Sequence, residues 1–285
     1  MSARRLAVVG PGRVGWALAR AAGGAGYTVA AIAGGTPAAR ASLAAATGAE
    51  DLAQVQRMAD VAADIVLLTV PDREIVGLAR ALRGLDAALV HPAGALAASA
   101  LGVPRAGSFH PLCSFAGPPR DVDLRGFGVA IDATDGELAA VLRRLAEALG
   151  MVPLDVPPES RARYHAAAVL AGNASLALLE AARRQLVALG LDADVSARVL
   201  AGLLGSVAGN VQRLGLDEAL SGPIRRGDVE TVTRNLDALD SGDPEAAAVY
   251  RLLGRLTLGV AARLPAAPSA TERERLSEVL GGDLK

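Results

Sequence analysis

Short apolar runs alternate with amphipathic stretches through the first half of the chain, and this alternation predicts its architecture. A near-continuous apolar run such as Asp64–Val70 is typical of a parallel strand that is covered on both faces. Strands and helices in alternation predict an α/β fold with a doubly wound parallel Rossmann-type sheet. The other predicted strands are Leu6–Val9, Tyr27–Ala33, Ala87–Val90, Arg105–Phe109 and Gly126–Asp132, and the predicted helices are Val14–Ala22, Asp51–Asp60, Asp72–Leu82 and Glu137–Leu149.

The pattern changes to helix alone in the second half. Met151–Glu159 contains three prolines and predicts an extended link. Ser160–Leu189 has no proline and keeps a helical period, so it predicts one long helix that ends at Gly190. Further helices are predicted over Asp192–Leu214, Val229–Leu239, Pro244–Ala262 and Thr271–Leu280. We therefore expect a Rossmann-like domain over residues 1–155 and an all-helical C-terminal domain over residues 156–285.

A glycine motif joins the first predicted strand to the first predicted helix. The segment Gly10-Pro11-Gly12-Arg13-Val14-Gly15 is a G-x-G-x-x-G in the strand–turn–helix context of a dinucleotide fingerprint. In that fingerprint the first glycine allows the tight turn, the second admits a pyrophosphate, and the third allows close packing of the helix on the strand. The N–H groups at the start of the helix would hold the phosphates. The alternative is a glycine-rich turn with a purely structural role.

The end of the second predicted strand bears on the choice of cofactor. A dinucleotide fold that binds NAD carries an acidic residue there for the ribose 2′-hydroxyl. This chain has Gly34-Gly35-Thr36 instead, so nothing would repel a 2′-phosphate. Thr36 would donate a hydrogen bond to that phosphate and Arg40 would supply charge. The sequence thus favours NADP over NAD, the alternative being a loose turn and a solvated arginine.

Composition and charge exclude several classes of function. The 285 residues carry a formal net charge of −1, which argues against a nucleic-acid footprint. The single cysteine, Cys113, precludes an intrachain disulfide, and Lys285 is the only lysine. We find no signal segment and no uninterrupted apolar run of membrane-spanning length. The sequence thus predicts a cytoplasmic protein with no membrane partner.

The three histidines are the main candidates for chemistry. His91 and His110 follow predicted strands, at the edge of the sheet where ligands bind, and His165 lies early in the long helix. We expect His110 and His165 to orient or protonate a substrate, whereas each of the three could instead be a core or capping residue. No helical pair of histidines four residues apart and no cysteine cluster supports a metal site.

Further polar residues lie in the helical half. Asn173 comes eight residues after His165, so both side chains can project from one helix face. The loop Ser221–Asp228 holds Arg225, which could bind a substrate carboxylate. Asp228 could contribute to the same site or simply cap the next helix.

These motifs together resemble a family of two-domain proteins that join a Rossmann-like half to the domain of unknown function 2520. The family is similar to the pyrroline-5-carboxylate reductase, ketopantoate reductase and 6-phosphogluconate dehydrogenase group. The resemblance implies a nicotinamide cofactor in the first half and a helical second half that often forms a homodimer. The stretches that carry it are Val9–Gly15, Val70-Pro71-Asp72, His91–Leu96, His110–Gly117, Tyr164–Ala168 with Asn173, and Ser221–Asp228.

The resulting hypothesis is an NADP-dependent oxidoreductase that transfers a hydride to a C=O or C=N carbon. The substrate would be a small carboxylated molecule, a ketopantoate-like 2-oxo acid or a cyclic imine, in an interdomain cleft. Two alternatives stay open: a non-catalytic NAD(P)-binding sensor or scaffold, and a deazaflavin cofactor. We assign the cofactor to Gly10–Gly15, Gly35, Thr36, Arg40, Val70, Pro71, His91, Pro92, Ala93 and Gly94, catalysis to His110, His165 and Asn173, and substrate binding to Ser114, Arg225 and Asp228.

Overall fold

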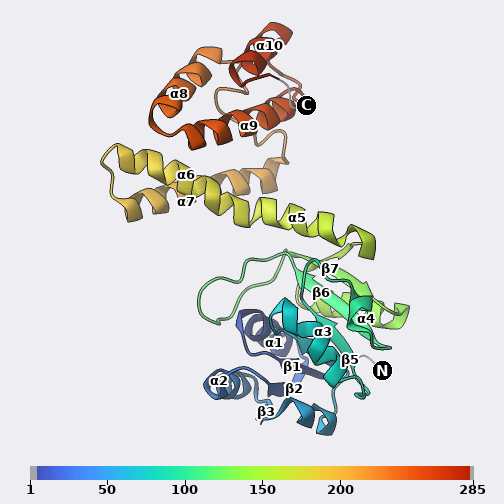
Figure 1. Cartoon of the computed structure of the whole chain (residues 1–285). Helices are drawn as coiled ribbons and strands as arrows, with labels where there is room; N and C mark the ends of the chain where they lie inside the picture. The colour runs from blue at the N-terminus through green and yellow to red at the C-terminus, as the bar shows by residue number, and fades with distance from the viewer. Residues whose placement is uncertain (1–4, 283–285) are drawn as a thin grey trace. The chain divides into compact units, whose positions relative to one another are not determined.

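The structure is a computed structural model that describes residues 5–282 (Figure 1). The chain forms two compact units, one ending at Gly172 and one beginning at Asn173. The division lies 17 residues beyond the position expected from sequence, because the helix that follows the sheet packs with the first unit.

The first unit is built on one eight-stranded sheet with the order β3-β2-β1-β4-β5-β6-β7-β8. Neighbouring strands pair in parallel except β6 and β7, which are antiparallel. The predicted doubly wound Rossmann-type fold is therefore confirmed. The strands are β1 Arg5–Val9, β2 Thr28–Ala33, β3 Glu50–Leu52, β4 Ile65–Leu68, β5 Ala88–His91, β6 Ala106–Pro111, β7 Gly128–Ala133 and β8 Val152–Asp155.

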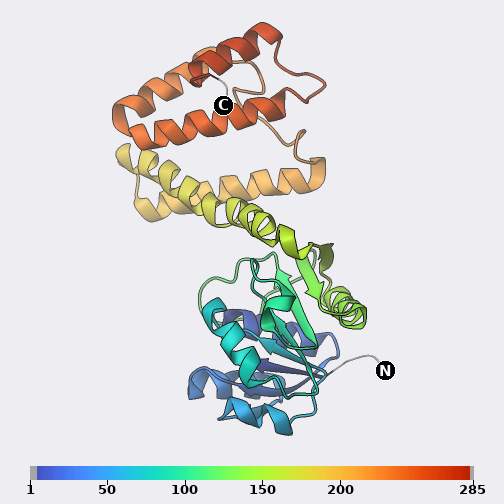
Figure 2. The same cartoon turned by 45° about the vertical axis from the view of Figure 1, so that its right-hand side comes forward.

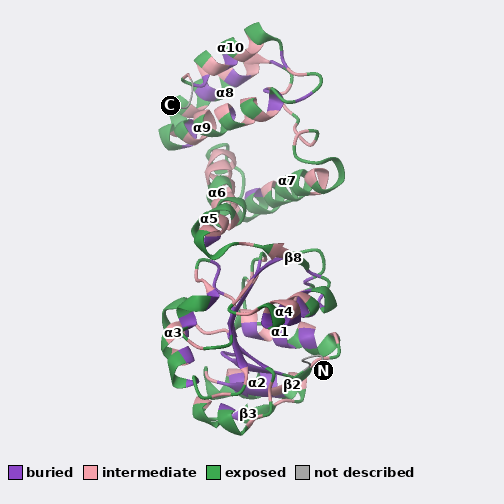
Figure 3. Ribbon diagram, turned by 90° about the vertical axis from the view of Figure 1, so that its right-hand side faces the viewer, coloured by how far each residue is buried: buried purple, intermediate pink, exposed green. Residues whose placement is uncertain are grey.

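Helices cover both faces of this sheet (Figure 3). The helices α1 (Arg13–Gly24), α2 (Pro37–Thr47) and α4 (Gly136–Ala148) pack in one apolar cluster with the strands. On the other face, α3 (Asp72–Ala81) and the short 3-10 helices η1 (Val55–Asp60) and η2 (Ala98–Leu101) form a second cluster. The central strands are buried on both sides, which explains their near-continuous apolar sequences.

Two strands were not predicted, and one predicted strand runs antiparallel to its neighbour in a sheet that was expected to be parallel. The predicted helix over residues 51–60 is instead β3 followed by η1. The predicted link after residue 151 contains β8, an outer strand in which Pro153 is tolerated because strand edges need fewer ladder hydrogen bonds. Strand β7 runs antiparallel to β6 because a 16-residue loop without helix, residues 112–127, separates them.

The long helix predicted over residues 160–189 is interrupted at Gly172. The structure has α5 (Arg161–Ala171) and then α6 (Asn173–Ala188). Gly172 lies between the two helices with φ −95° and ψ −79°. A Cβ at this position would lie 3.1 Å from the Ala168 carbonyl oxygen, so the chain packs tightly at the break.

The second unit consists of a helix pair and a three-helix cluster (Figure 2). The pair is α6 with α7 (Ala193–Leu214). The cluster comprises α8 (Val229–Gly242), α9 (Pro244–Ala261) and α10 (Ala270–Val279) around a small apolar core. These bounds agree closely with the helices expected from the sequence.

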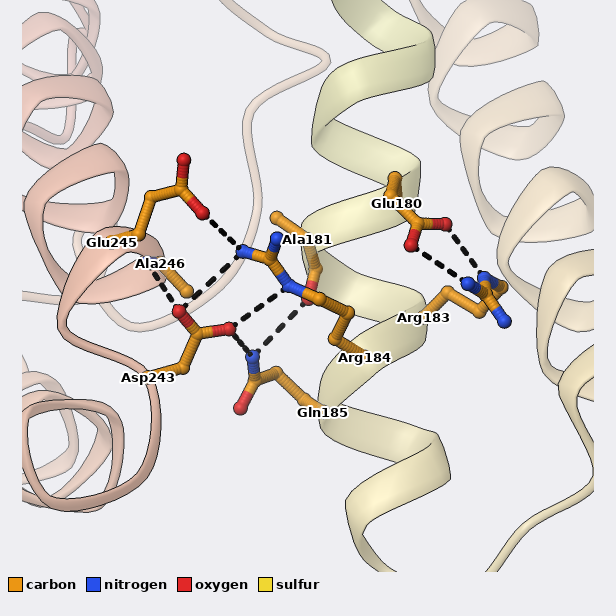
Figure 4. Close-up of polar contacts among 8 residues, drawn as sticks. All are labelled: Glu180, Ala181, Arg183, Arg184, Gln185, Asp243, Glu245 and Ala246. Atoms are coloured by element: carbon orange, nitrogen blue, oxygen red, sulfur yellow. Dashed lines mark hydrogen bonds and ion pairs between the residues drawn. The ribbon is translucent and has the colours of Figure 1, made fainter.

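Asp243 connects the pair to the cluster (Figure 4). It caps α9 by accepting a 3.0 Å hydrogen bond from the Ala246 amide. Arg184 and Gln185 of α6 donate to the same carboxylate at 3.1 and 2.9 Å. The Ala246 bond is the first cause of a lowered Asp243 pKa. Arg184 also reaches Glu245 at 3.0 Å.

The helix pair exposes much apolar surface. On α7, Val195, Val199, Leu203 and Val207 recur every four residues and are 43%, 57%, 62% and 46% exposed. The helical stretch Pro158–Ala188, with mean hydropathy 1.2, is long and apolar enough to cross a membrane by length and composition only. Monomers rarely leave contiguous apolar surface of this kind uncovered.

Candidate active site

The glycine motif forms a tight turn between β1 and α1. Gly10 has φ +110°, and a Cβ there would lie 2.6 Å from the Thr69 carbonyl oxygen. A Cβ on Gly15 would overlap the Gly10 carbonyl oxygen and lie 2.6 Å from Thr69 Oγ1. The Thr69 hydroxyl donates to the Gly10 carbonyl at 2.7 Å and fixes the turn from the neighbouring strand. Two of the three glycines are therefore required by close packing.

Gly12 differs because nothing lies within 4 Å of the position of its missing Cβ. It is the N-cap residue of α1, no side chain caps this helix, and no acidic residue lies in its first turn. The N–H groups at the start of α1 therefore have no capping side chain and lie at the positive end of a helix dipole. This arrangement fits the pyrophosphate of a dinucleotide, which needs donors, positive potential and room.

The residues predicted to bind the adenosine end of the cofactor are only partly available for binding. Gly35 lies at φ +64°, where a Cβ would meet the ring of Pro11 at 2.8 Å. Thr36 caps α2 by accepting from the Ala39 amide at 3.2 Å, and its hydroxyl proton can still be donated. Arg40 is buried in an ion pair with Asp51, so binding of a 2′-phosphate by Arg40 would require this pair to open. That role stays a prediction.

The strands place two histidines at the same edge of the sheet. His91 ends β5 and pairs in register with Ser108 of β6, and His110 follows two residues later on β6. The segment Val70-Pro71 follows β4, the next strand along, so it lies at this edge as well. The carboxyl ends of β1, β4, β5 and β6 therefore carry the glycine turn and both histidines side by side.

Helix α5 contributes a third histidine and a tyrosine to this edge. The His110 Nδ1 and the Tyr164 hydroxyl are 2.7 Å apart, and the His110 and His165 rings meet edge-to-face with centroids 5.9 Å apart. A Cβ on Gly94 would lie 2.9 Å from His110 Nε2 and would overlap His165 Nδ1. Both imidazole nitrogens thus converge above Gly94, where only glycine fits.

Burial determines the protonation states in this histidine cluster, which comprises His91, His110, Tyr164 and His165. It lowers the pKa of His110 to about 4, with the charges of His165 and Arg161 acting in the same direction. It raises the pKa of Tyr164 to about 12. At neutral pH, His110 is therefore a neutral imidazole and Tyr164 a protonated phenol. Because a neutral imidazole has one N–H, the tyrosine hydroxyl can donate to Nδ1 while Nε2–H faces Gly94.

His91 is more enclosed than the other two histidines. It is fully buried, and burial lowers its pKa to about 4. Its Nδ1 accepts a 3.2 Å hydrogen bond from the Ala93 amide and so orders the turn His91–Gly94. This contact positions Gly94 under the cluster.

The remaining predicted site residues have contacts of their own within their units. Ser114 lines a hollow of about 30 Å³ beside Arg13 in the first unit. Asn173 begins α6 in the second unit and is exposed. Arg225 donates to the carbonyl oxygens of Glu218 and Leu220 at 3.2 and 2.6 Å. Asp228 caps α8 by accepting from the Thr231 amide at 3.0 Å. Roles for Asn173, Arg225 and Asp228 in catalysis or substrate binding stay predictions.

Sequence reasoning missed two residues of this region. Thr69 fixes the glycine turn, and Arg161 is buried at the start of α5, where its charge acts on His91 and His110. The only available signal for Arg161 was its position four residues before His165, which places both on one helix face. Within residues 5–282, no group of three or more His, Cys, Asp or Glu side chains is arranged to hold a metal ion.

Two family models match the chain. Residues 5–90 match the NADP oxidoreductase, coenzyme F420-dependent family, and residues 127–257 match the domain of unknown function DUF2520. No curated protein sequence matches. The first of these models supports the general class of oxidoreductase.

Solved structures share the fold over most of the chain. A Bacteroides fragilis protein assigned as an NADP oxidoreductase is 26% identical with a TM-score of 0.70, over 90% of this chain and 98% of that chain. A Thermotoga maritima protein is 24% identical with a TM-score of 0.72 over the same shares. Pyrroline carboxylate reductase of Plasmodium falciparum, solved with NADP bound, is 11% identical with a TM-score of 0.60, over 99% of this chain and 100% of that chain.

These findings confirm the resemblance that the motifs indicated: the chain joins a segment that matches the F420-dependent NADP oxidoreductase family to a segment that matches DUF2520, on a fold shared with pyrroline carboxylate reductases.

Proposed function

We propose that the protein is an NADP-dependent reductase of a small carboxylated substrate with a C=O or C=N bond. The observation that carries the proposal is the convergence of His110 Nε2 and His165 Nδ1 above Gly94, at the sheet edge that also bears the glycine turn. The match to an NADP oxidoreductase family and the fold shared with an NADP-bound reductase support this choice of cofactor.

Residues of the first unit have distinct roles in cofactor binding and proton transfer. The turn Gly10–Gly15 binds the pyrophosphate through backbone N–H groups, and a bound nicotinamide supplies the hydride. His110 donates its Nε2–H to the oxygen or nitrogen of the reacting double bond. The Tyr164 hydroxyl holds His110 in the tautomer that makes this donation possible. His165 contacts the substrate from α5 at the same point and relays a proton from solvent to the oxygen or nitrogen that the hydride transfer leaves negatively charged.

Substitution of His165 tests this assignment. His165→Ala should leave the NADPH affinity within about twofold of wild type and lower turnover by about 10²- to 10⁴-fold, the usual contribution of a positioned acid. Arg163→Ala is the matched control, since that side chain is exposed on the same helix. Unchanged turnover in the His165 variant would remove this residue from the mechanism.

The preference for NADP over NAD is part of the proposal. It depends on Thr36 and the absence of an acid at residues 34–36, because Arg40 is paired with Asp51. We expect NADPH to bind at least about tenfold more tightly than NADH, which corresponds to about 1.4 kcal/mol. Equal or weaker binding of NADPH would contradict this preference without affecting the reductase class.

A homodimer through the helical unit is the proposed covering for the apolar stripe on α7. The stripe Val195, Val199, Leu203 and Val207 extends along a 22-residue helix, which is about 33 Å long. A second copy packed along this helix would remove the stripe from water. We also propose that the protein is cytoplasmic, as the sequence predicts.

The second candidate is an NAD(P)-binding sensor that does not turn over. It is favoured over a conventional ketopantoate reductase because Arg225 already donates to backbone carbonyl oxygens and because the sequence has a single lysine, at its last position. Cofactor binding without substrate-dependent oxidation would distinguish it from the reductase.

A further inference from the structure

Arg161 is the largest fully buried side chain among residues 5–282. It is the first residue of α5 and is 1% exposed. Its Nε, Nη1 and Nη2 atoms are all buried without a hydrogen-bond partner. A guanidinium has five N–H donors and stays charged at physiological pH, so it cannot relieve its burial by losing a proton.

The surroundings of Arg161 offset little of the free-energy cost of burying its charge. Burial is the first cause that lowers its pKa, and the charge of Asp132 opposes this shift. Among residues 5–282, no acidic group forms an ion pair with Arg161, and the Asp132 Oδ2 atom accepts a 2.7 Å hydrogen bond from the Ala98 amide instead. Burying an unpaired charge is strongly unfavourable. A protein keeps such a group where an anion pairs with it.

Arg161 lies within the histidine cluster. Its charge lowers the pKa of both His91 and His110 and also that of Tyr164. It precedes Tyr164 by three residues and His165 by four, so all three project from one face of α5. The cluster is not sealed, because His110, Tyr164 and His165 are only partly buried.

We propose that Arg161 binds the carboxylate of the substrate, next to the reacting carbon held by His110 and His165. This inference rests on the proposed reductase function and adds a specificity-determining residue to it. A planar carboxylate matches the guanidinium fork in two parallel hydrogen bonds. The guanidinium charge beside the neutral imidazoles of His91 and His110 suits a monoanion better than a phosphate with two charges. Arg161 therefore replaces Arg225 as the carboxylate-binding residue.

The test measures binding without turnover, so it does not depend on finding the substrate. Oxamate is a small carboxylate that resembles a 2-oxo acid, and oxamide is its neutral counterpart. Both are titrated into the NADPH-saturated protein by calorimetry. We expect oxamate to bind and oxamide to bind at least tenfold more weakly. Arg161→Gln should weaken oxamate about 30-fold, equivalent to about 2 kcal/mol, and should leave oxamide unchanged.

Matched variants distinguish binding from a structural role. Arg163→Gln removes an exposed arginine two residues away and should bind oxamate like wild type. Arg161→Lys should retain part of the affinity. Arg161→Met should melt at a higher temperature than wild type without ligand, because it removes an unpaired buried charge, and should lose the thermal shift caused by oxamate.

Three results would overturn the inference: oxamate binding that is absent or insensitive to Arg161, equal loss of oxamate and oxamide binding, or tighter binding of inorganic phosphate than of oxamate. Failure of the reductase proposal has a different signature. In that case oxamate binding would still depend on Arg161, while no carboxylate would accept a hydride from NADPH.

Discussion

The glycine turn permits a test in which cofactor binding and folding separate. Gly12 has φ −77° and ψ −169°, an extended conformation that alanine adopts freely, and its Cβ would project into open space. Alanine is a poorer N-cap residue than glycine, which lowers the unfolding free energy by a few tenths of a kcal/mol or more. Alanine also makes the unfolded chain less flexible, and this raises the unfolding free energy by a similar amount. Gly12→Ala should therefore change the unfolding free energy by no more than about 0.5 kcal/mol.

The same substitution should impair NADPH binding. The added Cβ occupies the space that the pyrophosphate needs and keeps it from the uncapped N–H groups of α1. Hydrogen bonds to a charged group contribute about 1.5–3 kcal/mol each, so losing one weakens NADPH binding about 10- to 150-fold. Titration followed by nicotinamide fluorescence measures this loss, and a thermal melt of the same sample measures stability.

Gly15→Ala is the matched comparison. Its Cβ would overlap the Gly10 carbonyl oxygen and crowd Thr69 Oγ1 at 2.6 Å, so the helix must shift from the strand. Overpacking of this kind costs about 1–3 kcal/mol, which lowers the melting temperature by roughly 2–12 °C. If Gly12→Ala binds NADPH like wild type, or if it unfolds as Gly15→Ala does, the interpretation of the turn as a pyrophosphate cradle is refuted.

Three further predictions concern the histidine cluster and the helical unit. Burial lowers the pKa of His91 and His110 from 6.5 to about 4, so their contribution to the unfolding free energy is fully present above pH 6.5 and is lost as the pH falls toward 4. The loss should reach up to about 3 kcal/mol per histidine. Urea unfolding at several pH values measures it, and an unfolding free energy that does not change with pH would contradict it. Asp243→Ala should destabilise the protein by about 1–3 kcal/mol in urea, because α9 loses its cap and Arg184 keeps only Glu245 as a carboxylate partner, and a loss below about 0.5 kcal/mol would argue against this role. Leu203→Glu should convert the proposed dimer to a monomer in light scattering, and a dimer of unchanged stability would place the interface elsewhere.

The fold was largely predictable because the sequence signals were local. Buried parallel strands are apolar without interruption, and glycine and proline mark most helix ends. The failures depended on long-range pairing. Strand β8 contains Pro153 and forms only because β7 is available beside it, and three residues of β3 are too few to show a period. The break at Gly172 was visible as a glycine, but the strong apolar period around it concealed the interruption.

The candidate site was predictable in its elements but less so in its contacts. Two of the three histidines, His91 and His110, were expected at one edge of the sheet because the carboxyl ends of parallel strands meet there, and His165 was expected near them at the start of the long helix. The burial of Arg161 and the engagement of Arg40 with Asp51 depend on three-dimensional packing, and a sequence pattern does not distinguish a solvated arginine from a buried one. The convergence of two imidazoles above Gly94 likewise follows only from the placement of α5.

The most direct test of the reductase is the oxidation of NADPH with a panel of small 2-oxo acids and cyclic imino acids. The account predicts that at least one panel member gives saturable oxidation of NADPH, with the hydride recovered on the former C=O or C=N carbon. His110→Phe and His165→Ala should lower that rate by at least about 100-fold while still binding NADPH. NADPH binding with no oxidation above the substrate-free rate for every member of the panel would contradict the account and favour a nucleotide sensor.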